Sequence, residues 1–494
     1  MAPAEALPQT LYTAEQSREL DAIATRDGDP DGYRLMCRAG QASLDRLQSL
    51  WPGSSVSIVC GAGNNAGDGY VIGRLARQAG LTVSLYALVN AESLRGDAAR
   101  ACADFVTAGG KIESGIRASL KGAVIVDALL GTGITRPVGG EFAGAVEKIN
   151  DAESQVLAID VPSGLCADTG SILGQAVKAD VTLTFIGVKQ GLLTGAGPEQ
   201  CGKLLFDDLA VEPSVYAQVP PAATRLGERL IQTSLPPRPA DSHKGSFGRL
   251  LLVGGNQGMP GALRLAGAAA LRSGAGVVQL ATHPSYSQAV AESRPELMIR
   301  SVADADQLAP LLDQADVVAV GPGLGTDPWA QEIWHACANF DGPMVVDADA
   351  LNLLAAEPFQ RHNWVLTPHP GELARLLRVS SAEVQANRFA AVRRARSELG
   401  GVALVKGAGT IIDDGQNLKV CSLGNPGMAT AGMGDVLTGV IASLLCQGFT
   451  PAEGAALGVT VHAAAGDLAA EGGQRGLLAG DVVDQLRRVV NPCS

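Results

Sequence analysis

Aromatic residues, paired cysteines, basic charge and long apolar runs are all scarce in this sequence of 494 residues. Only 4% of the residues are aromatic while 61 are glycine, a balance typical of α/β proteins with tight turns between strands and helices. The 9 cysteines are scattered singly, with no CxxC pair. This pattern excludes a disulfide framework and a zinc–cysteine site, and it indicates a reducing, cytoplasmic environment.

The charge balance and the hydropathy pattern exclude several classes of partner. A formal net charge of −12 argues against a nucleic-acid partner and against an anionic membrane surface. No stretch of about 18 residues is both apolar and uncharged, and residues 1–10 lack the basic and apolar regions of a signal peptide. Any phosphate site must therefore be local and built largely from backbone N–H groups.

The length and the spacing of short apolar runs predict two α/β domains. The chain is too long for one ordinary core, and a proline-rich stretch interrupts it near residue 220. We expect one domain over 1–220, a linker over 221–243 and a second domain over 244–494. On both sides of the linker, apolar runs alternate with helical segments, as in parallel sheets covered on both faces. The predicted strands are 56–60, 82–87, 123–127, 156–160, 181–185 and 203–206, then 249–253, 277–281, 317–320, 344–347, 364–366 and 403–406.

Three polar motifs follow predicted strands of the first domain. They are Gly61–Gly69, Asp127–Gly133 and Asp160–Gly164; the first is not the dinucleotide fingerprint, because Ala66 stands at its third glycine. Ligands bind at the carboxyl ends of parallel strands, so these motifs are expected to form one site, although an Asp at such a junction is also a common helix cap. Their oxygen donors favour a hard or alkali cation over zinc, and one carboxylate would serve in acid–base chemistry.

The segment Asn425–Asp435 is the most informative part of the second domain. Small residues and glycines lead into Asp435 and then into an apolar stretch that predicts a helix. Converging N–H groups and the positive end of this helix would bind an anion, with the Asp435 carboxylate at the rim. The arrangement suits transfer of a phosphoryl group to a hydroxyl that Asp435 deprotonates. A plain glycine-rich turn before a helix capped by Asp435 is the structural alternative.

These motifs resemble the family of bifunctional NAD(P)H-hydrate repair enzymes, in which an epimerase is fused to an ADP-dependent dehydratase. The three motifs of the first domain resemble the epimerase pattern, which implies a Rossmann-like three-layer αβα fold there. The second domain resembles the dehydratase branch of the ribokinase-like superfamily, which implies a ribokinase-like αβα fold. The motifs that carry this second resemblance, in order, are Gly254–Asn256, Gly274–Gly276, Gly321–Gly325, Asp347–Asn352, Thr367–Glu372, Lys406–Thr410 and Asn425–Asp435.

For the first domain, the resemblance implies interconversion of the R and S epimers at the hydrated C6 of the nicotinamide ring. Asp160 would be the acid–base group, and Asn65, Asp127 and Ser163 would hold a potassium ion. The hydrated nucleotide would contact Asn64, Asn65, Ala66, Gly67, Asp68, Gly131, Thr132, Gly133, Ile134, Thr135, Arg136, Pro137 and Asp160.

For the second domain, the resemblance implies dehydration of the S epimer of NADHX or NADPHX by means of ADP, with release of AMP and phosphate. Asp435 would be the catalytic base, and Glu372 would position a magnesium ion that binds with ADP. His369 stands where related vitamin kinases have Asn, which favours the dehydratase branch. ADP would contact Lys406, Gly407, Ala408, Gly409, Thr410 and Gly434, and the hydrate would contact Ala262, Gly323, His369 and Asp435.

A different interpretation is a vitamin- or sugar-type small-molecule kinase fused to a non-catalytic nucleotide-binding module. The sequence leaves open the choice between NADHX and NADPHX and the replacement of ADP by ATP. Glycine-rich faces and the family resemblance favour a homo-oligomer. The isolated histidines, His462 among them, are expected to be packing or surface residues.

Overall fold

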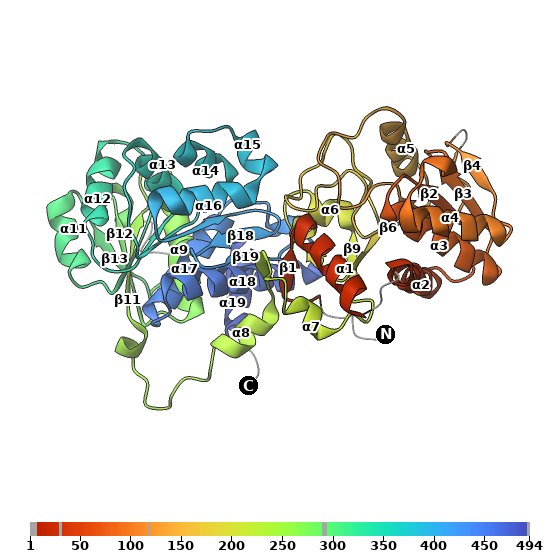
Figure 1. Cartoon of the computed structure of the whole chain (residues 1–494). Coiled ribbons are helices and arrows are strands. Elements are labelled where there is room, and N and C mark those ends of the chain that lie inside the picture. The colour runs from red at the N-terminus through yellow and green to blue at the C-terminus, as the bar shows by residue number, and fades with distance from the viewer. Residues whose placement is uncertain (1–6, 29–31, 117–118, 289–293, 492–494) are drawn as a thin grey trace. The chain divides into compact units, whose positions relative to one another are not determined.

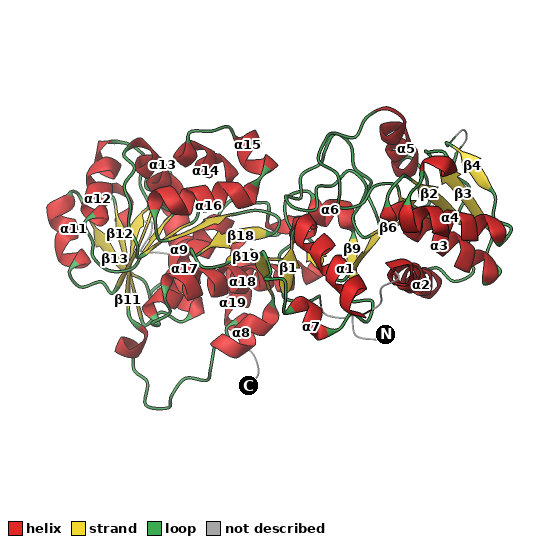
Figure 2. Cartoon of the chain, viewed as in Figure 1, coloured by secondary structure: helices red, strands yellow, loops and turns green. Residues whose placement is uncertain are grey.

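The computed structural model describes residues 7–28, 32–116, 119–288 and 294–491. The chain divides into two compact units, residues 1–224 (unit 1) and 225–494 (unit 2) (Figure 1). In each unit, strands of a largely parallel sheet lie between layers of helices (Figure 2). The fold class predicted from the sequence, two α/β domains, is confirmed.

Unit 1 is built on a seven-stranded sheet in which every pairing is parallel. The strand order reverses between β2 and β5, which places a ligand-binding crevice at the carboxyl ends of these two strands. In spatial order the strands are β4 (Ile112–Ser114), β3 (Val83–Ala87), β2 (Val56–Cys60), β5 (Val124–Ala128), β6 (Gln155–Ile159), β7 (Val181–Phe185) and β9 (Lys203–Asp207).

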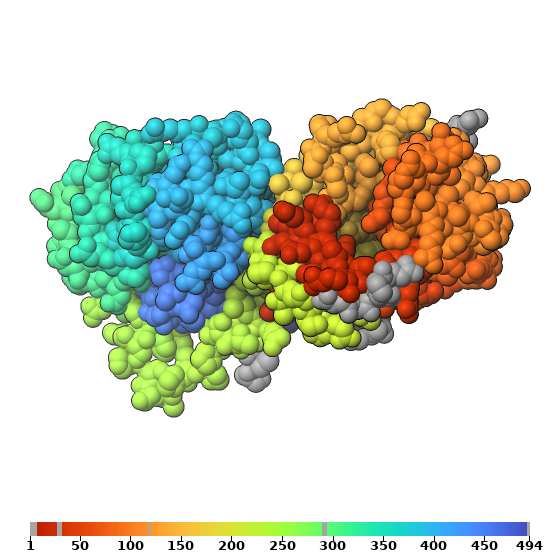
Figure 3. All heavy atoms as spheres, in the orientation of Figure 1, coloured from red at the N-terminus to blue at the C-terminus, as the bar shows by residue number. Residues whose placement is uncertain are grey.

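Helices cover both faces of this sheet. Successive strand residues point to opposite sides, and in a strand such as β2 all of them are buried, so both faces need a covering layer. Ile58 packs with Tyr70 of α3 and Phe105 of α4, whereas its neighbour Val59 packs with Val146 of α5. Helix α1 forms part of the surface of unit 1 (Figure 3, red). The helices are α1 (Ala14–Gly28), α2 (Gly32–Leu50), α3 (Asn64–Gln78), α4 (Gly96–Thr107), α5 (Gly140–Asn150), α6 (Gly197–Cys201) and α7 (Pro213–Tyr216), and a short strand β1 (Thr10–Tyr12) pairs with β8 (Val188–Lys189) and β10 (Ala223–Leu226).

Unit 2 contains a longer sheet that is parallel through its first seven strands and continues into an antiparallel hairpin, beside which β10 lies. Its order reverses between β11 and β14, which again opens a crevice at the carboxyl ends. In spatial order the strands are β13 (Met298–Ser301), β12 (Val277–Thr282), β11 (Arg249–Gly254), β14 (Val317–Val320), β15 (Met344–Val346), β16 (Trp364–Leu366), β17 (Val402–Val405), β18 (Thr410–Asp413) and β19 (Leu418–Cys421).

The helices of unit 2 pack in layers against this sheet. On one face, Leu263 of α9 and Ile441 of α17 pack with Leu252 of β11, and on the other face, Ile333 of α12 packs with Leu251. The helices are α8 (Glu228–Ser234), α9 (Pro260–Ser273), α11 (Ala305–Leu312), α12 (Pro328–Ala338), α13 (Ala348–Ala356), α14 (Pro370–Leu377), α15 (Ser381–Ala386), α16 (Arg388–Leu399), α17 (Met433–Cys446), α18 (Pro451–Ala469) and α19 (Ala479–Val489).

The segment 221–243, predicted as a linker, begins with regular structure. It contains the end of the chain's first unit, strand β10 and helix α8, and the longest stretch without a helix or strand is 235–243. All cysteines of the described residues are free. No helix among the described residues is long and apolar enough to cross a membrane.

Candidate active sites

Asp435 lies in the first turn of α17, at the carboxyl edge of the sheet in unit 2. The helix begins at Met433, and Gly432 is its N-cap with a φ of 89°, a left-handed conformation that favours glycine. Asp435 is therefore not the capping residue that the structural alternative required. The first N–H groups of a helix have no intrahelical partner, so they are available to an anion. Burial, with a contribution from Asp347, raises the pKa of Asp435 to about 7.

Lys406 places a positive charge beside this helix terminus. Its Nζ donates to Asp347 Oδ1 at 2.7 Å and lies 3.9 Å from Glu372 Oε2. Thr438 of α17 donates to the other carboxylate oxygen of Asp347, also at 2.7 Å. A Cβ added to Gly434 would lie 3.2 Å from Lys406 Nζ, so a side chain at that position would crowd the ammonium group.

The two buried partners of this ion pair keep each other charged. Burial alone would raise the pKa of Asp347, but the Lys406 ammonium together with hydrogen bonds from Thr438 and Thr367 holds that pKa below its usual range. Burial would likewise lower the pKa of Lys406, but Asp347 and Glu372 outweigh it and raise that pKa. The site therefore combines a fixed ammonium group with one carboxyl, Asp435, that titrates near neutral pH.

The segment Lys406–Thr410 connects β17 to β18 and is held from behind by Arg388 of α16. The Arg388 side chain is only 1% exposed. Its guanidinium donates to the carbonyl oxygens of Ala408, Val405 and Lys406 at 2.5, 3.1 and 3.2 Å. Because N–H and C=O groups point in opposite directions across a trans peptide, the N–H groups of residues 407 and 409 turn away from Arg388. Such a loop is suited to an anion.

His369 and Glu372 form a capping box at the start of α14. The His369 ring accepts from Gly371 N at 3.0 Å, and Glu372 Oε2 accepts from His369 N at 2.7 Å. The second oxygen of Glu372 lies 3.4 Å from His369 Nε2. Burial raises the pKa of Glu372. Both oxygens of this carboxylate thus have neighbours within the protein.

Ala262 and Gly323 lie next to each other at the start of α9 and after β14. A Cβ at Gly323 would lie 3.3 Å from the Ala262 side chain, and the Gly323 φ of 61° is left-handed. One turn along α9, Leu265 approaches Gly432 so closely that a Cβ there would meet its side chain at 2.6 Å. The structure therefore brings the residues predicted for substrate and ADP, with Asp435, to one edge of the sheet of unit 2.

In unit 1, Asn65, Asp127 and Ser163 come together at the point where the strand order reverses. Ser163 Oγ donates to Asp127 Oδ1 at 2.6 Å, and Ser163 N donates to Oδ2 at 2.8 Å. Asn65 Nδ2 donates to Leu130 O at 3.0 Å, while its buried Oδ1 has no hydrogen-bond partner in the described part of the chain. Burial raises the pKa of Asp127 to about 6. A buried carboxylate beside an unpaired carbonyl oxygen fits a bound cation.

Asp160 follows β6 and adopts a left-handed conformation with a φ of 66°, which is strained for a residue with a side chain. Thr184 Oγ1 donates to its Oδ1 at 3.0 Å, and Phe185 N donates at 3.2 Å. The ammonium group of Lys189, a residue that is 2% exposed, forms an ion pair with the same oxygen. Lys189 also donates to Phe185 O at 3.0 Å. Asp160 is thus held in place from several directions.

Of the remaining predicted residues of unit 1, 64–68 form the first turn of α3 and Gly131 lies beside it. Asn64 begins helix α3, and Asn65, Ala66, Gly67 and Asp68 complete its first turn, where N–H groups can meet a phosphate. Burial raises the pKa of Asp68 well above its usual range, and the nearby Asp160 adds to this effect. A Cβ at Gly131 would lie 3.3 Å from the Asn65 side chain, so Gly131–Pro137, which contains no helix or strand, starts beside that turn.

Comparisons with known proteins identify the family of both units. A family model described as NAD(P)H-hydrate dehydratase matches residues 250–488, and one described as YjeF-related protein N-terminus matches residues 32–191. The bifunctional NAD(P)H-hydrate repair enzyme of Coxiella burnetii is 46% identical over 98% of this chain and 99% of its own length. The enzyme of the same name from Escherichia coli K12 is 42% identical over 98% of this chain and 95% of its own length.

The chain belongs to the family of bifunctional NAD(P)H-hydrate repair enzymes. The family resemblance seen in the sequence motifs is confirmed. Unit 2 also matches the solved structure of a ribokinase-like superfamily protein from Enterococcus faecalis V583, at 31% identity and a TM-score of 0.50 over 54% of this chain and 95% of that chain. The ribokinase-like fold predicted for this half of the repair-enzyme chain is therefore confirmed.

Three residues of these sites escaped the sequence reasoning: Lys189, Arg388 and Asp347 as a partner of Lys406. Lys189 had a usable signal, because it is the one charged residue between Asp180 and Glu199. A charge in such an apolar segment indicates a buried partner. Arg388 has no comparable signal, because its partners are backbone carbonyl groups. His462, expected to be a packing residue, is buried, and burial lowers its pKa to about 4.

Proposed function

We propose that this chain repairs hydrated NADH and NADPH with two active sites, an epimerase in unit 1 and an ADP-dependent dehydratase in unit 2. The supporting observation is the pair of carboxylates, Asp160 and Asp435, each held at the carboxyl edge of its own sheet beside a helix N-terminus or an ammonium group. We assign 1–220 to the epimerase domain and 244–494 to the dehydratase domain, joined by 221–243.

In the dehydratase site, Asp435 accepts the proton of the C6 hydroxyl as that oxygen bonds to the β-phosphorus of ADP. The bond between this phosphorus and its bridging oxygen breaks, and AMP leaves. A pKa of about 7 leaves Asp435 largely ionised just above neutrality while it stays basic enough to accept a proton. Gly432–Gly434 and Lys406 face the negative charge that develops on the transferring group.

Phosphorylation makes elimination possible because it replaces a poor leaving group. Water has a pKa of about 15.7 whereas the second pKa of phosphate is about 6, so the leaving-group advantage is at most about 13 kcal/mol. The C6–O bond then breaks with its electrons on phosphate, the ring nitrogen supports the positive charge, and the adjacent carbon loses a proton. These steps restore the reduced nicotinamide and yield AMP and phosphate.

A magnesium ion bound with ADP would neutralise phosphate charge in this site. Glu372 is the carboxylate that would position this magnesium ion, as predicted from the sequence. Glu372 Oε2 accepts from His369 N, and Oε1 lies 3.4 Å from His369 Nε2, so the carboxylate that would position the ion is held in place by His369. Among the described residues, no group of three or more His, Cys, Asp or Glu forms a metal site. This is consistent with an ion that arrives with the nucleotide.

In the epimerase site, Asp160 exchanges a proton with the C6 hydroxyl or the ring as this hydroxyl is lost and returned on the opposite face. A positioned carboxylate of this kind contributes about 10²- to 10⁴-fold to a rate. Lys189 holds Asp160 in position through their ion pair. Asn65, Asp127 and Ser163 would hold potassium, whose charge would attract the diphosphate of the hydrate toward the first turn of α3.

Several aspects of this function follow from composition and family. We propose a cytoplasmic enzyme with small-molecule substrates, NADHX or NADPHX together with ADP, and a homo-oligomeric assembly. Neither nucleic acid nor membrane is proposed as a partner, since the net charge is −12.

The test is to incubate the purified chain with both NADHX epimers, ADP and magnesium and to follow the absorbance of the reduced nicotinamide. We expect complete conversion, with AMP and free phosphate as products. The variant Asp435→Asn should lose dehydration and keep epimerisation, whereas Asp160→Asn should convert only the S epimer. A stable phosphate ester formed from ATP without free phosphate would instead identify a kinase.

A further inference from the structure

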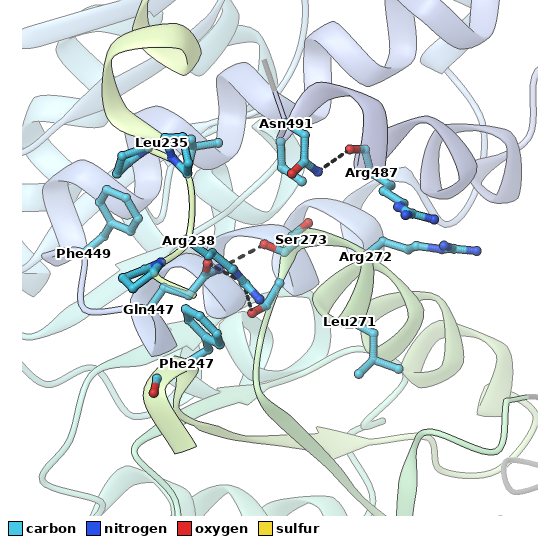
Figure 4. Close-up of a pocket in the computed structure, with 16 residues that line it drawn as sticks. Leu235, Arg238, Phe247, Leu271, Arg272, Ser273, Gln447, Phe449, Arg487 and Asn491 are labelled. Atoms are coloured by element: carbon cyan, nitrogen blue, oxygen red, sulfur yellow. Dashed lines mark hydrogen bonds between the residues drawn. The ribbon is translucent and has the colours of Figure 1, made fainter. Parts of the chain in front are cut away.

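Unit 2 contains a cavity of about 580 Å³ that lies apart from the residues of the dehydratase site. It is bounded by residues 235–239 and by the carboxyl-terminal ends of α9, α17 and α19 (Figure 4). Asp435 lies at the other end of α17, and at about 1.5 Å per residue the twelve residues to Gln447 span roughly 18 Å. Pockets of about 300–1,000 Å³ accommodate small organic ligands.

The cavity gathers positive charge without a counter-charge. Arg238, Arg272 and Arg487 line it, and no Asp or Glu does. Figure 4 shows the Arg272 and Arg487 side chains extended in the same direction. In the described part of the chain, neither of these two side chains forms an ion pair, and the buried Nε of Arg272 has no hydrogen-bond partner. Guanidinium groups arranged in this way attract a phosphate.

The helix ends do not account for all three arginines. Arg238 donates to Gly274 O at 2.6 Å and stacks on Phe247 at 3.5 Å, and Gln447 donates to Ser273 O at 3.0 Å. These two side chains already satisfy the carbonyl groups at the end of α9. Arg272 and Arg487 lie in the last turns of α9 and α19, where their charge favours the helix terminus, but among the described residues neither side chain donates a hydrogen bond to a carbonyl group.

The walls of the cavity add a polar and an apolar feature. Ser273 is 3% exposed, and its Oγ has no hydrogen-bond partner among the described residues. A buried hydroxyl without a partner is energetically unfavourable. Phe247, Phe449 and Leu271 provide an apolar surface on the same cavity. The ligand that matches these features carries a phosphate group on an aromatic or aliphatic body.

We propose that this cavity is a second ligand site that binds a small organic phosphate ester, with Arg272 and Arg487 beside the phosphate. It is separate from the ADP site and independent of the reaction proposed above. The probe is phenyl phosphate, titrated calorimetrically into the full-length chain, with inorganic phosphate and phenol titrated in parallel.

Phenyl phosphate is expected to bind at least about tenfold more tightly than either fragment, with an affinity unchanged by saturating ADP and magnesium. Arg272→Gln and Arg487→Gln should each weaken binding about tenfold, since each removes a charged partner of phosphate. Arg488→Gln is the matched control, because it removes the neighbouring arginine of α19, which does not line the cavity.

The proposal is overturned if phenyl phosphate does not bind at millimolar concentration or if ADP displaces it. It is equally overturned if Arg488→Gln weakens binding as much as Arg487→Gln, because the effect would then reflect net charge alone. Circular dichroism of each variant establishes that it is folded. Binding of phenyl phosphate by the arginine variants tests this second site even if the chain proves unable to use ADP, so failure of this proposal can be told apart from failure of the proposed function.

Discussion

The pH dependence of dehydration is the most direct consequence of the environment of Asp435. Because a base must be ionised to accept a proton, kcat/KM for the S epimer should rise with pH through the pKa of about 7. The ionised fraction is about 1% at pH 5, about half at pH 7 and about 90% at pH 8 for such a pKa. We therefore expect a rise of roughly 90-fold between pH 5 and pH 8, measured from the absorbance of the reduced nicotinamide.

Asp347→Asn tests the cause of this pKa. Burial raises the pKa of Asp435 most, and the charge of Asp347 adds to it while Lys406 opposes it. Removing the Asp347 charge also releases Lys406 from its nearest partner, so both effects shift the profile to lower pH. Asp484→Asn, an exposed change on α19, is the control and should leave the profile in place. A flat wild-type profile from pH 5 to pH 8 would refute the assignment of Asp435 as the base.

Three further predictions concern the residues around the two sites. Lys189→Met should lower the epimerisation rate about 10²-fold without changing dehydration of the S epimer, because Asp160 loses its ion pair. Arg388→Lys should raise KM for ADP about tenfold at nearly unchanged kcat, since one ammonium group cannot bind three carbonyl oxygens in the same fork. Potassium at ten times its dissociation constant should stabilise the chain by about 1.4 kcal/mol, and this effect should grow as pH rises past about 6, where Asp127 ionises.

Each of these predictions has its own control. Lys178→Met removes an exposed lysine of unit 1 that pairs with Glu199, and it should leave epimerisation unchanged. Arg394→Lys is the control for Arg388→Lys, because Arg394 is an exposed arginine of the same helix, α16. An equal rise in KM for ADP in this variant would contradict the role of Arg388. For potassium, the reference is thermal unfolding in tetramethylammonium chloride at equal ionic strength. Asn65→Ala should abolish the extra stability that potassium gives over this reference. If the extra stability persists in that variant, the cation binds elsewhere.

The buried strands could be predicted from the sequence because each is a short apolar run between turn residues. Val56–Cys60, Val181–Phe185, Val317–Val320 and Trp364–Leu366 have the predicted bounds. The edge strand β13 was missed because its residues are largely exposed and dilute the apolar pattern. The hairpin β18–β19 is mostly buried, but polar residues such as Asp413 and Lys419 interrupt its two short apolar runs. Strand β10 and helix α8 were hidden within a segment whose prolines indicated a linker.

Some residues of the two sites could be predicted from their neighbours in sequence, whereas others are recognised only from contacts formed on folding. Asp160 and Asp435 are visible in sequence because glycines and prolines next to them force the turns that expose them. Lys189, the partner of Asp160, is visible only as a lone charge in an apolar segment. Arg388 gives no signal, because its partners are backbone carbonyl groups that folding arranges around it. The roles of the individual site residues stay predictions until the variants above are measured.

The carbonyl contacts of Arg388 have a consequence for nucleotide selection. A loop whose carbonyl groups are held inward presents main-chain N–H groups outward, and these respond to charge and shape but carry no information about a base. Such a loop would accept the diphosphate of a guanosine or uridine nucleotide as readily as that of adenosine. Any preference for adenine must then arise from side chains outside residues 406–410.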